Sequence, residues 1–375
     1  MKYFLLTRGD FMFKCIFSFL FLSLLTFFSH FTFAACSLSQ GTRDDPYILS
    51  TRILTMPINR TISVPSDVQP GQEIYRQYIN LKNMGIAYVT CDSTAQFYGG
   101  YEYANTPLPF YNASQKIYET GVSGIGIKFT SSADFPYTVA ICGVVRSCAY
   151  NSGWSAYSYF SLIKTANVVV PDVIQGIKLP TVVYSFGQID SMAQVYKITL
   201  SGNITITVPT CNITPASQSM TVNMGKYDIA AFTGKDATTP WKNASIQLTN
   251  CGQFYGNSQG GNTMATFDGS AVTYYNLNNN FLSITLTPLN GIEDAAKGIM
   301  KIKDQPLKAT GVGIQLSTSE STSGLVNLAS PVTQTLPKDG TQSITVPLYA
   351  RYIQTEDSVK AGKADGRLEY VITYQ

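Results

Sequence analysis

Short segments of alternating apolar and polar residues recur along the chain, and they restrict its fold more than any other feature. They are rich in Val, Ile, Thr and Tyr, and clusters of Gly, Asn, Pro or Ser separate them, as in GIAYVTC, YTVAICGVV, NITITV and SITVPLYARY. No stretch longer than a turn or two has the 3.6-residue period of an amphipathic helix. The pattern predicts an all-β protein of the sandwich type.

A domain boundary is expected at Val208 and Pro209. An alternating strand, ITITV, stops there at the proline, and the sequence resumes with Cys211. With 375 residues the chain is long for one domain and comfortable for two. We therefore expect two β-sandwiches, at residues 35–208 and 209–375, and we expect the first to fold independently.

The first 34 residues predict a secretory signal peptide. Basic residues precede an apolar run that ends at Phe28, and small residues at Ala34 and Ala35 offer a cleavage site. A membrane anchor is the alternative, but the apolar run is short for a span. Met12 is a second candidate start that would give a more compact signal. Cleavage after Ala34 would leave Ala35 at the mature N-terminus.

Six of the seven cysteines lie beyond the expected signal: Cys36, Cys91, Cys142, Cys148, Cys211 and Cys251. An even number of cysteines in an exported chain predicts three disulfides, although six cysteines can pair in about fifteen ways. Closeness in the chain favours Cys142 with Cys148. The domain boundary favours Cys36 with Cys91 and Cys211 with Cys251. A zinc site is the competing interpretation, but the sequence has neither a CxxC pair nor a nearby His to build one.

The composition argues against nucleic acid binding and against catalysis. Charged residues make up only 13% of the chain, and no polybasic patch remains after the signal. The only His, His30, lies in the signal, so the usual general base is missing. A glycosidase with two carboxylates is the main enzymatic alternative, but Asp and Glu are scattered without a motif. We expect no enzyme activity, no cofactor and no metal site.

The last nine residues, RLEYVITYQ, alternate up to the end of the chain and predict a terminal strand. They complete an ordered set of motifs in the second half that resembles the pilin domain of chaperone–usher fimbriae. The other motifs are CNI at 211–213, VNMG at 222–225, GVGIQL at 311–316, ITVPLYARYIQT at 344–355 and AGKA at 361–364.

The resemblance implies that the Ig-like sandwich lacks its seventh strand, so that the terminal strand borders an open groove. In such pilins a periplasmic chaperone lends a strand to the groove and holds the C-terminal carboxylate. After delivery to an outer-membrane usher, the N-terminal extension of the next subunit replaces that strand. The residues implied in strand exchange are Leu368, Tyr370, Ile372, Tyr374 and Gln375. The alternative for RLEYVITYQ is an ordinary edge strand of a complete sandwich.

The arrangement of the two halves resembles two-domain tip adhesins such as that of type 1 fimbriae. A pilin usually begins with a free donor strand, but here YKITLSGNITITVPTC follows a whole domain and is interpreted as its last strand. Such a subunit accepts a donor strand and gives none, so the resemblance implies a place at the fimbrial tip on the bacterial surface. It also implies a lectin-like N-terminal domain with a glycan receptor. The alternative is a structural minor pilin or adaptor that binds no sugar.

Two Tyr-rich stretches contain the residue types that bind sugars, namely flat aromatic rings with amide and carboxylate groups. In the type 1 adhesin the mature N-terminus and an acidic residue after the second cysteine line the pocket, which implies Ala35 and Asp92 here. The chain lacks the aromatic first residue and the Asn-Asp pair of that adhesin, a departure that argues against mannose as the ligand. Core packing is the alternative for each tyrosine. The predicted ligand-binding residues are Ala35, Asp92, Gln96, Tyr98, Tyr101, Tyr103, Asn151 and Trp154.

Overall fold

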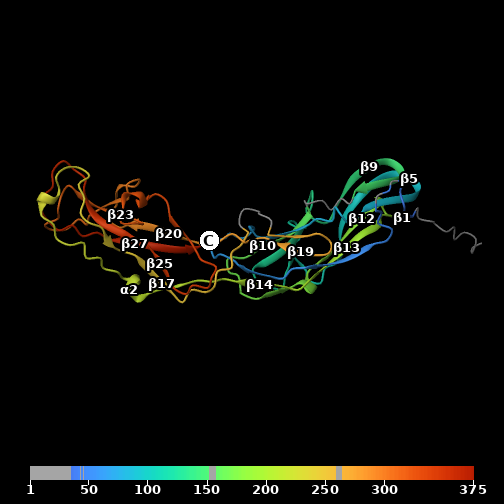
Figure 1. Ribbon diagram of the computed structural model, residues 1–375, viewed down its shortest axis with the longest axis horizontal. Helices are drawn as coiled ribbons and strands as arrows, with labels where there is room; N and C mark the ends of the chain where they lie inside the picture. Colours follow the sequence, from blue (N-terminus) through green and yellow to red (C-terminus); the bar gives the residue numbers. More distant parts are fainter. Residues whose placement is uncertain (1–34, 43, 45, 152–157, 259–263) are drawn as a thin grey trace, which may run out of the picture.

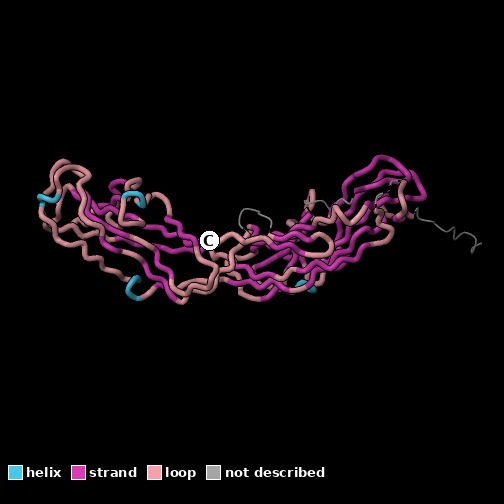
Figure 2. Tube along the Cα trace, viewed as in Figure 1, coloured by secondary structure: helices cyan, strands magenta, loops and turns pink. Residues whose placement is uncertain are grey.

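The computed structural model describes residues 35–42, 44, 46–151, 158–258 and 264–375. Strands make up nearly all of the regular structure, which confirms the predicted all-β class (Figure 2). The molecule is elongated, with two β-domains end to end and the C-terminus close to their junction (Figure 1). No helix in the described part of the chain has the length and apolar character of a membrane span. The short helical turns are η1 (Gly176–Lys178), α2 (Pro215–Gln218), η2 (Ile229–Ala231) and η3 (Thr322–Gly324).

The N-terminal domain contains three sheets. The six-stranded sheet has the order β1-β5-β12-β13-β2, with β9 paired to β5, and the seven-stranded sheet has the order β19-β18-β4-β10-β8-β7-β6. A three-stranded sheet, β11-β14-β3, lies toward the junction. The strands are β1 (Cys36–Leu38), β2 (Arg52–Pro57), β3 (Arg60–Ser63), β4 (Glu73–Ile79), β5 (Ile86–Asn105), β6 (Phe110–Asn112), β7 (Ile117–Glu119), β8 (Ile125–Thr130), β9 (Tyr137–Asn151), β10 (Ser158–Lys164), β11 (Val173–Gln175), β12 (Thr181–Gln188), β13 (Ala193–Ser201), β14 (Asn203–Thr207), β18 (Ala265–Phe267) and β19 (Val272–Tyr274).

Aromatic rings fill much of the core of the N-terminal domain. Every residue of β12, TVVYSFGQ, is buried, since the strand lies between β5 and β13 and is covered on both faces. Tyr184 on β12 lies 4.9 Å from Tyr101 on β5, measured between ring centroids. Phe97 and Phe186 meet edge to face at 5.5 Å. Tilted and edge-on contacts of this kind stabilise the core beyond simple burial of area.

The C-terminal domain also contains three sheets, with the orders β15-β17-β25, β16-β26-β23-β22-β21 and β24-β20-β27. Its core is separate from that of the N-terminal domain and includes Ile246, Leu282 and Leu336, each fully buried. The strands are β15 (Asn212–Ile213), β16 (Lys242–Asn243), β17 (Ile246–Thr249), β20 (Phe281–Pro288), β21 (Ile292–Asp294), β22 (Ile299–Lys301), β23 (Val312–Ser317), β24 (Val332–Thr335), β25 (Ile344–Val346), β26 (Tyr349–Gln354) and β27 (Leu368–Tyr374).

The three disulfides join the pairs that chain proximity and the domain boundary favoured: Cys36–Cys91, Cys142–Cys148 and Cys211–Cys251.

Residues 264–278, which we call the clasp hairpin, depart from the expected division into two halves. They follow Pro209 in sequence, yet β18 pairs with β4 of the N-terminal domain. Met264, Phe267 and Leu277 are buried in the N-terminal core. The expectation that residues 35–208 fold alone is therefore revised, because part of their core comes from the second half of the chain. The boundary at 208 and 209 remains a proposal.

Candidate functional site

The terminal strand β27 is an edge strand, since it pairs with β20 alone among the described residues. The main-chain N–H of Gln375 donates to the carbonyl of Phe281 at 2.8 Å, and the N–H of Phe281 donates back at 2.7 Å. Hydrogen-bonded and non-hydrogen-bonded pairs alternate along an antiparallel ladder, so the odd-numbered residues of β27 bond to β20. The main-chain N–H and C=O groups that point to the open edge belong to the even-numbered residues Leu368, Tyr370, Ile372 and Tyr374.

Apolar side chains along this open edge are only partly covered. The even-numbered side chains of β27 pack against the C-terminal core but remain half-buried. Ile213, Val222 and Met224, from the segment that follows Cys211, are also partly buried against that core. A further strand with an apolar residue at every second position would satisfy the free main-chain groups and complete the burial of these side chains.

Two tyrosine hydroxyls link β27 to the segment that follows Cys211. Tyr370 donates to the carbonyl of Ser217 at 2.5 Å. The Tyr374 hydroxyl accepts from the N–H of Cys211 at 2.8 Å and donates to its carbonyl at 3.2 Å. Burial raises the pKa of both tyrosines, so both hydroxyls stay protonated and able to donate at neutral pH. These side-chain contacts hold the two sides of the groove together where no main-chain ladder joins them in the described structure.

The described residues before Cys211 contain no free donor strand. The chain enters the fold at β1, which pairs with β5 from Cys36 to Leu38. The alternating stretch before Pro209 forms β13 and β14, and each lies between two neighbours in its sheet. The sequence-based interpretation of this stretch as the last strands of the first domain agrees with this pairing.

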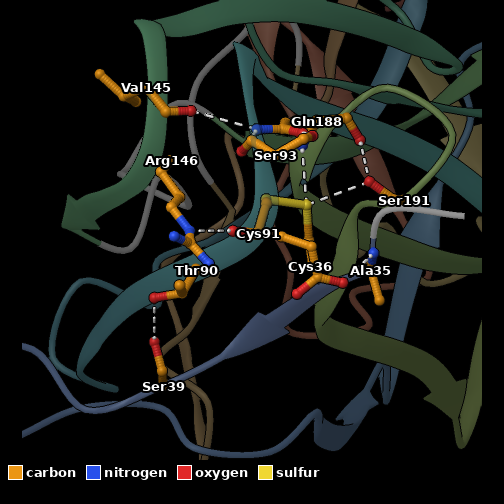
Figure 3. Close-up of a disulfide and its surroundings, with 11 residues drawn as sticks. Ala35, Cys36, Ser39, Thr90, Cys91, Ser93, Val145, Arg146, Gln188 and Ser191 are labelled. Carbon is orange, nitrogen blue, oxygen red and sulfur yellow. Dashed lines mark hydrogen bonds between the residues drawn. A yellow bond between two sulfur atoms is a disulfide. The ribbon is translucent and has the colours of Figure 1, made fainter. Parts of the chain in front are cut away.

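A second candidate site lies at the end of the N-terminal domain that is distant from the C-terminal domain, where β1, β5 and β9 meet (Figure 1). There the N–H of Ala35 donates to the Asp92 carboxylate at 3.0 Å, and the N–H of Asp92 donates to the carbonyl of Ala35 at 3.3 Å. The Cys36–Cys91 disulfide fixes the two strands directly beside this contact (Figure 3). The two residues that the adhesin resemblance implied are thus in contact, and Asp92 is exposed.

Gln188, which the sequence did not indicate, organises the same end. Its buried side-chain N–H₂ donates to the carbonyls of Ser93 at 2.7 Å and Val145 at 3.2 Å (Figure 3). Its side-chain oxygen accepts from the Ser93 hydroxyl at 2.7 Å. One glutamine therefore ties the end of β12 to β5 and β9. A glutamine at a strand end carries no sequence signal for this role, because its partners are distant in the chain.

Arg146 contributes a basic group at this end. Its Nε donates to the carbonyl of Cys91 at 3.1 Å, while the residue itself is exposed (Figure 3). The exposed side chains beside the disulfide thus include a carboxylate, a guanidinium and the hydroxyls of Ser93 and Thr94. Such groups form charge-assisted hydrogen bonds to the hydroxyls or acidic groups of a ligand.

The other predicted ligand residues are not all placed at this end. Tyr101 is 3% exposed, stacks on Tyr137 at 4.7 Å, and has its pKa raised by burial. Tyr103 packs edge to face on Tyr118 and Phe129. Because Tyr101 lies in the core and Tyr103 is partly buried against it, we leave both tyrosines out of the proposed site.

Gln96 and Tyr98 are half-buried on β5, and the Gln96 side chain donates to the carbonyls of Phe97 and Cys142. Only the main chain of Asn151 is described, opposite Ile86. Trp154 lies outside the described residues. Within the described residues, no group of three or more His, Cys, Asp or Glu side chains is arranged to hold a metal ion.

The known proteins that match this chain cover different parts of it. The family model described as "Fimbrial protein" matches residues 198–375. The S-fimbrial protein subunit SfaG of Escherichia coli O6:K15:H31 (strain 536 / UPEC) is 30% identical over 178 residues, which cover 48% of this chain and 82% of that protein. A fimbria adhesin protein of Klebsiella pneumoniae is 22% identical over 327 residues, covering 86% of this chain and 90% of that protein. The crystal structure of the CupB6 tip adhesin from Pseudomonas aeruginosa covers 90% of this chain and 93% of its own, with 12% identity and a TM-score of 0.30.

Proposed function

Since this chain belongs to the fimbrial protein family, whose members are fibre subunits and not enzymes, we propose that it is a tip adhesin. Its N-terminal domain binds a receptor, and its C-terminal pilin domain joins the fimbria. The observation that carries the proposal is the open edge of β27, combined with the lack of a free strand in the described residues before Cys211. A subunit that can only accept a strand ends the fibre.

The open edge also defines the partners. Before assembly a periplasmic chaperone adds a strand beside the even-numbered residues of β27 and contacts Gln375 at the end of that strand. At the outer-membrane usher the N-terminal extension of the next subunit takes over the same main-chain groups. Both steps are strand addition, in which main-chain hydrogen bonds give affinity and side-chain pockets give specificity. The route leads from the periplasm to the fimbrial tip at the cell surface.

The receptor site lies at the distal end, around Ala35 and Asp92. Cleavage after Ala34 would turn the Ala35 N–H into an α-ammonium group beside the Asp92 carboxylate, 3.0 Å from its nitrogen. This pair, with the exposed Ser93 and Arg146, presents both donors and acceptors at the tip of an elongated molecule. Sugar hydroxyls need such convergent donors and acceptors, so we propose that the receptor is a surface glycan.

A glycan array with the full chain, co-purified with its chaperone, tests this function. We expect retention of a defined set of glycans, and we expect Asp92→Ala to weaken binding of a retained glycan by roughly ten- to a hundredfold. That is the cost of about 1.5 to 3 kcal/mol for a lost hydrogen bond to a charged group. The thermal midpoint should stay the same, because Asp92 is exposed.

Glu119→Ala is the matched control for this prediction. Glu119 is also an exposed carboxylate, but it lies on β7 in the other sheet. It should leave glycan binding unchanged. Silence of the parent chain on the array would instead support a structural adaptor without sugar binding, and equal affinities of Asp92→Ala and the parent would remove Asp92 from the site.

A further inference from the structure

The clasp hairpin gives the N-terminal domain two strands from within the pilin domain sequence. β18 pairs in parallel with β4, so that Ala265 lies opposite Gln77 and Phe267 opposite Ile79. The N–H of Asn80 donates to the carbonyl of Phe267 at 2.8 Å. Phe267 is fully buried in the N-terminal core. Without the hairpin, β4 would be an open edge strand and a part of the core would face solvent.

Further contacts attach this region to β3. The Arg60 guanidinium donates to the carbonyl of Tyr275 at 2.6 Å and lies over the Tyr274 ring, 5.4 Å from its centroid. Ser63 donates its N–H to the carbonyl of Gly256 at 2.9 Å. The hairpin and the segment that leads to it are thus bound to two different sheets of the N-terminal domain.

The residues just before and just after the clasp hairpin, which form its base, contact the end of β27 at its open edge. Phe254, which is 2% exposed, stacks on Tyr374 with 5.9 Å between ring centroids. The buried Asn280 side chain accepts from the N–H of Gly256 at 2.9 Å. The next residue, Phe281, begins β20 and exchanges both main-chain hydrogen bonds with Gln375. The same few residues therefore join β27 to the two strands of the hairpin.

We propose that filling the open edge of β27 stabilises the N-terminal domain through the clasp hairpin, an inference that rests on the proposed strand acceptance. While the edge is empty, β27 and its contacts to Phe254 open easily, because edge strands with few main-chain bonds unfold locally. An added strand holds β27, and with it the base of the hairpin. Since the hairpin is part of the N-terminal core, the receptor-binding domain is fully stable only when the pilin domain is complemented.

Hydrogen exchange of the full chain at two concentrations of free chaperone tests the proposal. A ligand that binds only the folded form multiplies the folding equilibrium constant by 1 + [L]/Kd. Raising free chaperone from Kd to about 100 Kd therefore slows exchange from globally opened states roughly fiftyfold. We expect amides of β20 in the pilin domain and of β4 in the N-terminal domain to slow together. Slowing of β20 without slowing of β4 would overturn the coupling. If neither strand slowed, the proposed strand acceptance itself would be wrong.

Paired variants locate the coupling. Phe267→Ala should make β4 exchange faster and nearly independent of chaperone concentration, whereas Phe129→Ala, which empties an equally buried position on β8, should destabilise the domain and keep the dependence. Arg60→Ala, at a half-buried position, provides a milder variant that should reduce the dependence if Phe267→Ala does not fold. Full dependence in both Phe267→Ala and Arg60→Ala would show that the hairpin does not transmit the effect.

Discussion

Replacing Ile372 by proline is expected to weaken capture of the chain by its periplasmic chaperone. The N–H of Ile372 points to the open edge of β27, because the odd-numbered residues make the bonds to β20. Proline removes that donor, and its ring occupies the place of the incoming strand, while the ladder to β20 stays intact. An unsatisfied carbonyl in the added strand costs about 1 to 3 kcal/mol, or roughly five- to 150-fold in affinity. The yield of chaperone-bound chain from the periplasm measures the effect.

Two variants control for side-chain loss and for damage to the sheet. Ile372→Ala shortens the same half-buried side chain but keeps the N–H, so it should be captured much better than Ile372→Pro. Val371→Pro removes an N–H that bonds to β20 and should destabilise the folded sheet itself. Equal capture of Ile372→Pro and the parent would show that the open edge of β27 is not where the chaperone binds.

Loss of the Cys36–Cys91 disulfide should cause a large fall in the stability of the N-terminal domain. The two cysteines are 55 residues apart, and closing a loop of that size stabilises the folded state by about 4 kcal/mol through chain entropy. For a domain of this size that corresponds to a drop of roughly 8 to 16 °C in thermal midpoint. Alanine at both positions avoids placing a hydroxyl at Cys91, which is 1% exposed. Calorimetry of the full chain in its chaperone complex measures the midpoint.

The Cys142–Cys148 disulfide supplies the internal comparison. Its cysteines are 6 residues apart, so the same relation gives only about 2 kcal/mol for its removal. The first double variant should therefore lower the midpoint more than the second. It should also weaken glycan binding, since Ala35 directly precedes β1, which pairs with β5 over three residues only. A larger fall for the short-loop pair would show that loop entropy does not govern these disulfides.

Local patterns were enough to predict the fold class and the terminal strand. RLEYVITYQ alternates, and in the structure Leu368 to Tyr374 form a strand whose even-numbered side chains share one face. The motifs around Cys211, Val312 and Ile344 led to the fimbrial resemblance, and the family model and the SfaG match confirm it. These features depend on neighbouring residues, whose side chains carry the alternation and turn signals directly.

Features that depend on distant partners could not be predicted. In TFDGSAVTY, Asp268 and Gly269 mark a turn between two short strands, but nothing in that stretch indicates that Phe267 pairs beside Ile79. Tyr101 has the residue type of a sugar platform, and only the meeting of β5 with β9 and β12 buries it. Gln188 organises the distal end through Ser93 and Val145, which are 95 and 43 residues away.

Strand exchange in solution tests most directly whether the chain caps its fibre. The chaperone-bound chain is mixed with a chaperone-bound pilin of the same fimbria, and native mass spectrometry identifies which groove has been filled. We expect the pilin's N-terminal extension to displace the chaperone from β27 and give a one-to-one product. Oligomers formed by the chain alone, or a product in which this chain fills the pilin's groove, would contradict the proposal that it accepts a strand and donates none.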